Sequence, residues 1–346
     1  MRLKEIGEFG FIERIRDGCL VRSQDVVKHI GDDCFVFKGS RDMVMLFTTD
    51  ILVEGVHFLS RATAPYQLGR KSLAVNLSDI AAMGGIPKEA LISIAVPETV
   101  EVEYLDSVYN GMKSMAREFD VNLAGGDTSS SPDYLVINVA LVGEAPEEEV
   151  LYRSGARVGD VVFLTGPVGS SAAGLHIILS DVFFQGQDEL LHAHNDPVPH
   201  VKGGRIIASL KAAHSLIDVS DGVVADLGHI CNESRVGAVI EEESIPTTAR
   251  FREYCEQFGL DFRHLALQVG EDYVLLGTVP RKSSGKVEQA LISNGCAFFP
   301  IGETVSGAGV KLRCGDGSLQ EVERGGWNHF GANRFRESAR GTRGTR

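Results

Sequence analysis

The chain has 346 residues, which is longer than most single hydrophobic cores and predicts two domains. Its formal net charge of −13 disfavours nucleic acid and anionic membrane surfaces as partners. No apolar run approaches the ~18 residues of a membrane-spanning helix, and the first residues lack the apolar segment of a signal peptide. We therefore expect a cytoplasmic protein with neither a nucleic-acid nor a membrane partner.

Strand-like and helix-like segments alternate through the first half of the chain. In order, we expect a strand at 43–50, a helix at 66–84, a strand at 90–97, a helix at 104–120 and a strand at 134–144. Charged residues, Gly and Pro then interrupt the pattern at 144–160. We place a domain boundary there, with domains at 1–150 and 151–333 and a basic, disordered tail at 334–346.

The second half restarts the same alternation. We expect a strand at 161–166, a glycine-punctuated turn and helix at 167–179, a strand, acidic turn and helix at 215–233, and strands at 271–280 and 298–305. The glycine-rich stretch 166–174 lacks the Lys-Ser/Thr ending of a Walker A loop, so it is interpreted as a close strand–helix turn. The polar stretch "HAHN" at 192–195 is interpreted as an exposed loop.

Aspartates recur at strand ends and in Gly- or Ser-rich turns, where the backbone can approach a ligand closely. They are Asp32 and Asp33 in "GDD", Asp50 in "TTD", Asp79 in "LSD", Asp127 in "GGD", and Asp218 and Asp221 in "DVSD". Each one alone is also ordinary turn or cap chemistry. Crowded together, they would repel one another unless divalent cations neutralised them, and oxygen ligands suit Mg²⁺. The pattern favours a magnesium-dependent phosphoryl-transfer site.

The sequence offers no good candidate for a covalent nucleophile or a soft-metal site. It contains neither a GxSxG nor an HExxH motif, and its six cysteines are scattered without a CxxC pair. We expect the cysteines to be reduced packing residues.

Eight motifs occur in a fixed order: "GDDCFVF", "TTDILVEGVHF", "GRKSLAVNLSDIAAMGG", "AGGDTSSS", "RSGARVGDVVFLTG", "IDVSDGVVADLGHI", "GEDYVLLGTVP" and "GWNHF". Together they resemble the thiamine-monophosphate kinases of the aminoimidazole-ribonucleotide-synthetase-like superfamily. The resemblance implies an N-terminal α/β domain that binds ATP and magnesium, a C-terminal α+β domain, and a homodimer whose N-terminal sheets pair. It also implies direct in-line transfer from ATP to thiamine monophosphate, giving thiamine diphosphate, with several Mg²⁺ ions.

The resemblance also implies roles for individual residues. Those at the magnesium-ligand positions are Asp33, Thr48, Thr49, Asp50, Asp79, Asp127, Asp218 and Asp221. Those at the ATP-binding positions are Tyr109, Gly126, Asp127, Arg153 and Ser220, and those at the substrate positions are His57, Glu271 and Trp327. Asp32 and Asp272 receive no role. The chain departs from the family pattern at Val274, where a second glutamate is usual, and at His200, where arginine is common.

Two other functions stay open. One is another ATP-dependent enzyme of the superfamily, such as a phosphate-activating synthetase. Cys19 lacks the glycine run that selenophosphate synthetase has near its reactive residue, and "VEGVHF" is not explained by aminoimidazole ribonucleotide synthetase. The other is a non-catalytic regulator that binds ATP, which the complete set of aspartates disfavours.

Overall fold

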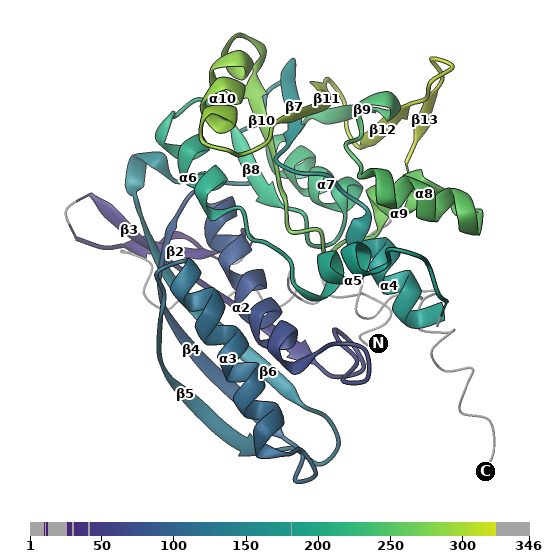
Figure 1. Ribbon diagram of the computed structural model, residues 1–346. Coiled ribbons are helices and arrows are strands. Elements are labelled where there is room, and N and C mark those ends of the chain that lie inside the picture. The colour runs from purple at the N-terminus through teal and green to yellow at the C-terminus, as the bar shows by residue number, and fades with distance from the viewer. Residues whose placement is uncertain are drawn as a thin grey trace.

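The computed structural model describes residues 10, 12, 26–29, 31–40, 42–180 and 182–322. Strands in this part of the chain form two sheets, and helices pack on them in layers (Figure 1). Trp327, Cys19 and the tail at 334–346 lie outside the described residues.

The first sheet has the strand order β1-β2-β3-β6-β4-β5. Its strands are β1 (Val26–Lys28), β2 (Phe35–Lys38), β3 (Met43–Val53), β4 (Ile86–Val96), β5 (Asn122–Ser130) and β6 (Val136–Pro146). The β4–β5 pair is parallel and the other pairs are antiparallel. Along β3 and β6, more buried side chains alternate with less buried ones, as expected for a sheet with one face on the core.

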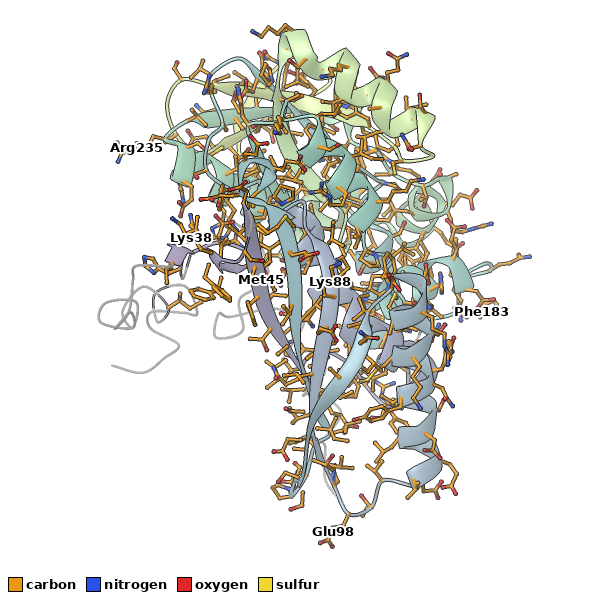
Figure 2. All side chains as sticks on the ribbon, turned by 90° about the vertical axis from the view of Figure 1, so that its left-hand side faces the viewer. Lys38, Met45, Lys88, Glu98, Phe183 and Arg235 are labelled. Carbon is orange, nitrogen blue, oxygen red and sulfur yellow. The ribbon has the colours of Figure 1, made fainter. Side chains whose placement is uncertain are left out.

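Helices α2 (Pro65–Ala82) and α3 (Val102–Glu118) pack on the buried face of this sheet (Figure 1). Figure 2 shows α3 to one side of the long strands. Two glycines allow the helices to cross closely. A Cβ on Gly69 would lie 1.8 Å from the Val108 carbonyl oxygen, and one on Gly111 would lie 1.9 Å from that of Tyr66. The close crossing therefore requires glycine at both positions.

The second sheet has the order β13-β12-β9-β11-β7-β10-β8. Its strands are β7 (Asp160–Leu164), β8 (Ser215–Asp218), β9 (Gly237–Glu241), β10 (Leu275–Pro280), β11 (Phe299–Val305), β12 (Val310–Arg313) and β13 (Leu319–Glu321). The β9–β12 pair is parallel and the others are antiparallel. Every residue of β7 is buried, which explains its continuous apolar run.

The helices of the second half are α4 (Ser170–Ser180), α5 (Asp188–Asn195), α6 (Val201–Ser209), α7 (Val223–Ser234), α8 (Ala249–Phe258), α9 (Phe262–Gln268) and α10 (Arg281–Ser293). Helix α6 packs against α2 of the first half. A Cβ on Gly204 of α6 would lie 2.1 Å from the Ala81 carbonyl oxygen, so this crossing is also close.

Two hydrophobic cores lie on opposite faces of the second sheet. Val161 and Phe163 of β7 belong to the core that also contains α2, α3 and the first sheet. Val162 and Leu164 of the same strand belong to a second core with α4, α7 and α8. Successive side chains of β7 point to opposite faces of the sheet, so this one strand contributes to both cores and connects the first half of the chain with the second.

The strands and helices expected from the sequence are confirmed, with two corrections. The stretch around Asp127, expected as a turn, forms strand β5, because its backbone pairs with β4 over the whole of 122–130. The stretch "HAHN", expected as an exposed loop, is the end of helix α5, and His194 and Asn195 in it are buried. Asn195 accepts a hydrogen bond from Thr63 at 2.9 Å, a contact with a distant segment.

Candidate active site

Three aspartates from distant parts of the sequence meet at the junction of the two halves. Asp33 precedes β2, Asp79 lies near the end of α2, and Asp218 ends β8. One carboxylate oxygen from each lies within 4.8 Å of the others. Three carboxylates this close form an oxygen-rich site of the kind that holds a divalent cation.

Hydroxyl and amide groups around this cluster fix the carboxylates. The Thr48 hydroxyl donates to Asp79, and the Ser78 hydroxyl donates to Asp218 at 2.6 Å. The backbone N–H of Asp50 donates to the Asn76 side-chain oxygen at 3.0 Å, which fixes the end of β3 against α2. Helix α2 therefore supplies both a carboxylate and the polar groups that orient its neighbours.

Burial and mutual repulsion disfavour ionisation of these aspartates. Burial raises the pKa of Asp33 to about 7, although Arg153 opposes the shift. Burial raises the pKa of Asp218 to about 6, again against Arg153. For Asp79, burial and then the charges of Asp50 and Asp218 raise the pKa well above its ordinary value. A bound cation would relieve this repulsion, so the donor set fits a hard metal ion such as Mg²⁺.

Arg153 is the cation nearest to Asp33. Its Nε lies 3.2 Å from Asp33 Oδ1, and its Nη2 binds the same oxygen. Asp32, which had no role in the sequence analysis, accepts from the Arg153 backbone N–H at 3.4 Å and pairs with Lys28 at 3.0 Å. Asp32 therefore fixes the segment that carries the arginine. The Arg153 side chain is 20% exposed, which leaves part of the guanidinium accessible to a phosphate.

A second group of possible metal ligands extends the acidic cluster. Ligand atoms of Asp221, Asp226 and His229 lie within 4.8 Å of one another. Asp226 also accepts from the backbone N–H groups of Asp221 and Gly222, at 3.2 and 3.1 Å. Asp226 and His229 were not among the residues predicted from the sequence. The available signal was an aspartate in the first turn of a helix, which is indistinguishable from an ordinary cap.

The predicted substrate residues His57 and Glu271 are close enough for the charge of one to act on the other. The charge of His57 contributes to the lowered pKa of Glu271, behind burial, which opposes the shift, and behind Lys71 and His194. Lys71 Nζ lies 3.0 Å from Glu271 Oε1, and His194 Nδ1 lies 3.4 Å from Oε2. Neither Lys71 nor His194 was expected from the sequence to be part of the site.

Asp272 closes the glycine-rich turn before α4. Both of its carboxylate oxygens accept from the backbone N–H of Gly169, at 3.1 and 3.0 Å. Burial raises the pKa of Asp272 to about 7, and hydrogen bonds from Gly169 and Ser171 oppose the shift. A helix N-terminus attracts anions, and here the chain supplies its own. The interpretation of 166–174 as a strand–helix turn is therefore confirmed.

Thr49 does not join Thr48 and Asp50. Successive side chains of a strand point to opposite faces, and the Thr49 hydroxyl accepts from Asn138 on the outer face of the first sheet at 2.9 Å. The third substrate residue, Trp327, lies outside the described residues.

Gly126 and Asp127 lie on the edge strand β5, exposed to solvent. Across the sheet, Asp50 of β3 lies opposite Val139 of β6, which lies opposite Ile92 of β4, which lies opposite Gly126 of β5. Gly126 is therefore three strand spacings, or about 14 Å, from Asp50, so β5 lies away from the cluster of its own chain. A Cβ on Gly126 would lie 1.7 Å from the Ile92 carbonyl oxygen, so glycine is required there. Tyr109 lies on α3, which packs on α2 and β5.

Two protein-family models match the chain in the order of its two sheets. They describe the N-terminal domain of AIR synthase related protein, at residues 31–145, and its C-terminal domain, at 157–315. The fold and its acidic junction thus define an AIR-synthase-related protein.

Comparison with individual proteins identifies the family more narrowly. The chain is 37% identical to the thiamine-monophosphate kinase of Aquifex aeolicus over 95% of this chain and 100% of that protein. It is 36% identical to that of Bacillus subtilis, over 87% and 93% of the two chains. The solved structure of "AaThiL complexed with AMPPCP and TMP" matches with a TM-score of 0.83 at 36% identity, covering 95% of this chain and 99% of that one. The chain belongs to the thiamine-monophosphate kinase family.

Proposed function

We propose that this protein transfers a phosphoryl group from ATP to thiamine monophosphate, giving ADP and thiamine diphosphate. The observation that carries the proposal is the meeting of Asp33, Asp79 and Asp218 beside Arg153 in a chain that matches thiamine-monophosphate kinases over nearly its whole length. The AaThiL structure, with the ATP analogue AMPPCP and TMP, supports the same pair of substrates.

The residues suited to hold magnesium are the carboxylates of Asp33, Asp79, Asp218 and Asp221, with Asp50 and the Thr48 hydroxyl beside them. Their oxygen-only donor set and the raised pKa values of Asp33, Asp79 and Asp218 support a cation at this place. Bound Mg²⁺ would neutralise phosphate charge and hold the two phosphates in line. We assign the ATP- and magnesium-binding role to 1–150 and the completion of the cleft to 151–333.

The chain's own groups then position the reactants. The Arg153 guanidinium, which is paired with Asp33 but partly exposed, is placed to bind a phosphate of ATP in place of the Asp33 carboxylate. Glu271 and His57 are assigned to thiamine monophosphate. Phosphoryl transfer between two anions needs alignment and charge neutralisation more than a proton-transfer group, which agrees with a site that has no evident nucleophile.

We propose further that the protein is a homodimer whose first sheets pair. The outer face of this sheet carries exposed apolar side chains: Phe35, Phe47, Ile51 and Leu91. Such a face favours burial against a second copy. Asp127 and Gly126 would then complete the nucleotide cleft from the partner side, which accounts for their distance from Asp50. Light scattering after size exclusion should give twice the chain mass, and Phe47→Lys should give a monomer. A wild-type monomer would contradict this arrangement.

The assignment is tested by a product assay. Purified protein is incubated with ATP, MgCl₂ and thiamine monophosphate, with free thiamine in a parallel tube, and thiamine diphosphate is read by chromatography. We expect diphosphate only from the monophosphate, and none from Asp50→Ala. The control is Asp316→Ala, an exposed aspartate in the β12–β13 turn. Folded wild-type protein that binds ATP but makes no diphosphate would refute the assignment.

The described part of the chain contains no helix long and apolar enough to cross a membrane. Among the described residues, Cys34, Cys255, Cys296 and Cys314 are free thiols. Free thiols are typical of a reducing compartment, which supports our proposal that the enzyme acts in the cytoplasm.

A further inference from the structure

Lys71 is a buried cation in the middle of helix α2. Its side chain is 1% exposed, and its ammonium nitrogen lies 3.0 Å from Glu271 Oε1. Among the described residues, the ammonium finds no hydrogen-bond acceptor of good geometry besides this ion pair. Because a buried charge is costly unless it is paired, the partner carboxylate is what makes lysine tolerable at this position.

The two members of the pair differ in access to solvent. The Glu271 side chain is 25% exposed, against 1% for Lys71. A ligand can reach Glu271 but not Lys71, so any effect of Lys71 on a ligand must act through Glu271.

His194 completes the support of Glu271. Its Nδ1 lies 3.4 Å from Oε2 and 3.1 Å from the Ser171 hydroxyl. Burial, and then Lys71, lowers the pKa of His194 to about 4, so the imidazole is neutral near pH 7. Lys71 is therefore the charged support of Glu271, and His194 is a neutral one.

Glu271 sits in a backbone conformation that needs outside support. Its φ is +66°, in the left-handed region that non-glycine residues rarely adopt. Its backbone N–H donates to the Ser220 carbonyl at 2.8 Å, next to the predicted metal ligand Asp221. A Cβ on the preceding Gly270 would lie 1.9 Å from the same carbonyl oxygen. The loop is thus pressed against the acidic cluster while Lys71 holds its side chain from the other half of the chain.

We propose that Lys71 is a positioning residue that keeps the Glu271 carboxylate aimed at the thiamine-monophosphate site, where the carboxylate meets a cationic or amino group of the substrate. This inference rests on the proposed function. It assigns to Lys71 an effect on recognition of thiamine monophosphate and none on ATP.

The test is a double-mutant cycle on the full chain, with Lys71→Met, Glu271→Gln and the double variant. Methionine keeps most of the volume of the lysine stem and removes the charge. The control is Lys311→Met, which removes an exposed lysine 3.5 Å from Glu321. The readouts are kcat and the KM values for thiamine monophosphate and for ATP, with thermal unfolding to confirm that each variant is folded.

Lys71→Met should raise the KM for thiamine monophosphate on the order of tenfold, the loss expected for one charged hydrogen-bonding group. The KM for ATP should change less than about twofold, and Lys71→Met should add nothing to Glu271→Gln. An unchanged KM for thiamine monophosphate, additive effects, or a parallel rise in both KM values would overturn the proposal. If Lys71→Met alone does not fold, the double variant should match Glu271→Gln, and a further rise in KM would overturn it. Failure of the proposed function itself appears in the wild type, as absence of product, before any variant is compared.

Discussion

Asp218 illustrates how individual side chains determine the properties of the site. It ends a buried strand, so the cost of removing its charge from water raises its pKa, and the Ser78 hydroxyl opposes this by donating to the carboxylate. Ser78 itself is fully buried on α2. It has no route to a ligand except through Asp218.

Ser78→Ala should therefore weaken magnesium activation. Losing one hydrogen bond to a metal-binding carboxylate lowers metal affinity by about 10- to 100-fold. The measurement is rate against MgCl₂ concentration at saturating ATP and thiamine monophosphate. Ser209→Ala, an exposed serine on α6, is the control and should follow the wild-type curve. An unchanged curve for Ser78→Ala would show that this hydroxyl does not tune the metal site.

The two departures from the family pattern, Val274 and His200, are neighbours. A Cβ on Gly166 would lie 2.7 Å from Val274 and 3.1 Å from His200. The His200 ring also contacts the Thr165 hydroxyl at 2.7 Å, and burial lowers its pKa to about 4. With valine and histidine in place of the family's usual glutamate and arginine, positions 274 and 200 form an uncharged contact.

Val274→Glu alone should bury a carboxylate without a cation and lower the free energy of unfolding by about 3 kcal/mol. Adding His200→Arg should recover at least half of that loss, since the guanidinium would pair with the new carboxylate. Urea unfolding of the single and double variants checks this. No recovery in the double variant would mean that the two positions are not coupled.

At the scale of elements, the sequence predicts what is local and misses what depends on partners. Helix α2 and strands β3, β6 and β7 follow from their apolar patterns. Strand β5 does not, because "AGGDTSSS" has the composition of a turn and becomes a strand only by pairing with β4. Helix α5 was missed for a similar reason, since His194 is stabilised by contacts with Ser171 and Glu271.

The same distinction holds for the site. Asp33, Asp218 and Asp221 could be predicted because each lies at a strand end or in a turn, where ligands are common. Asp50 instead lies inside β3, and Asp79 lies inside α2. Lys71 could not, because a lysine in a helix is normally solvated and its partner lies 200 positions further along the chain. Thr49 was identified by family position alone, and Asp127 also by its Gly- and Ser-rich surroundings; whether they bind metal remains a prediction.

The close crossing of α2 and α3 predicts that adding a single methyl group at Gly69 destabilises the protein. Gly69→Ala would place Cβ 1.8 Å from a backbone oxygen of Val108, so the helices must separate. We expect a loss of about 2–3 kcal/mol in the free energy of unfolding. Gly285→Ala on α10 is the matched control, since nothing lies within 4 Å of its Cβ, and it should gain up to about 1 kcal/mol. Equal stabilities of the two variants in urea would contradict the close crossing.

At the scale of the whole molecule, the acidic cluster links stability to both pH and magnesium. The pKa values of Asp33 and Asp218 in the folded chain, about 7 and about 6, exceed the ~3.9 of an unfolded aspartate. Between about pH 4 and pH 7 the folded state therefore holds protons that the unfolded state has released. Without metal, these two groups make stability fall as pH rises through this window.

Magnesium should reverse this trend, because it binds the deprotonated carboxylates and must displace their protons. We expect 10 mM MgCl₂ to raise Tm by on the order of 5 °C at pH 7.5 and by much less at pH 5.5. Differential scanning fluorimetry measures both shifts, with NaCl of equal ionic strength as the control. A shift at pH 5.5 as large as that at pH 7.5 would mean that the cluster does not bind the ion.

The core shared by the two halves also has a consequence for folding. Because Val161 and Phe163 of β7 complete the hydrophobic core of the first sheet, separating the two halves would expose apolar surface on both. Native-state hydrogen exchange should then report one cooperative unfolding unit spanning both sheets, rather than two independent foldons. During synthesis, the first half stays incompletely packed until the chain has been extended past Phe298, the last buried residue of this shared core.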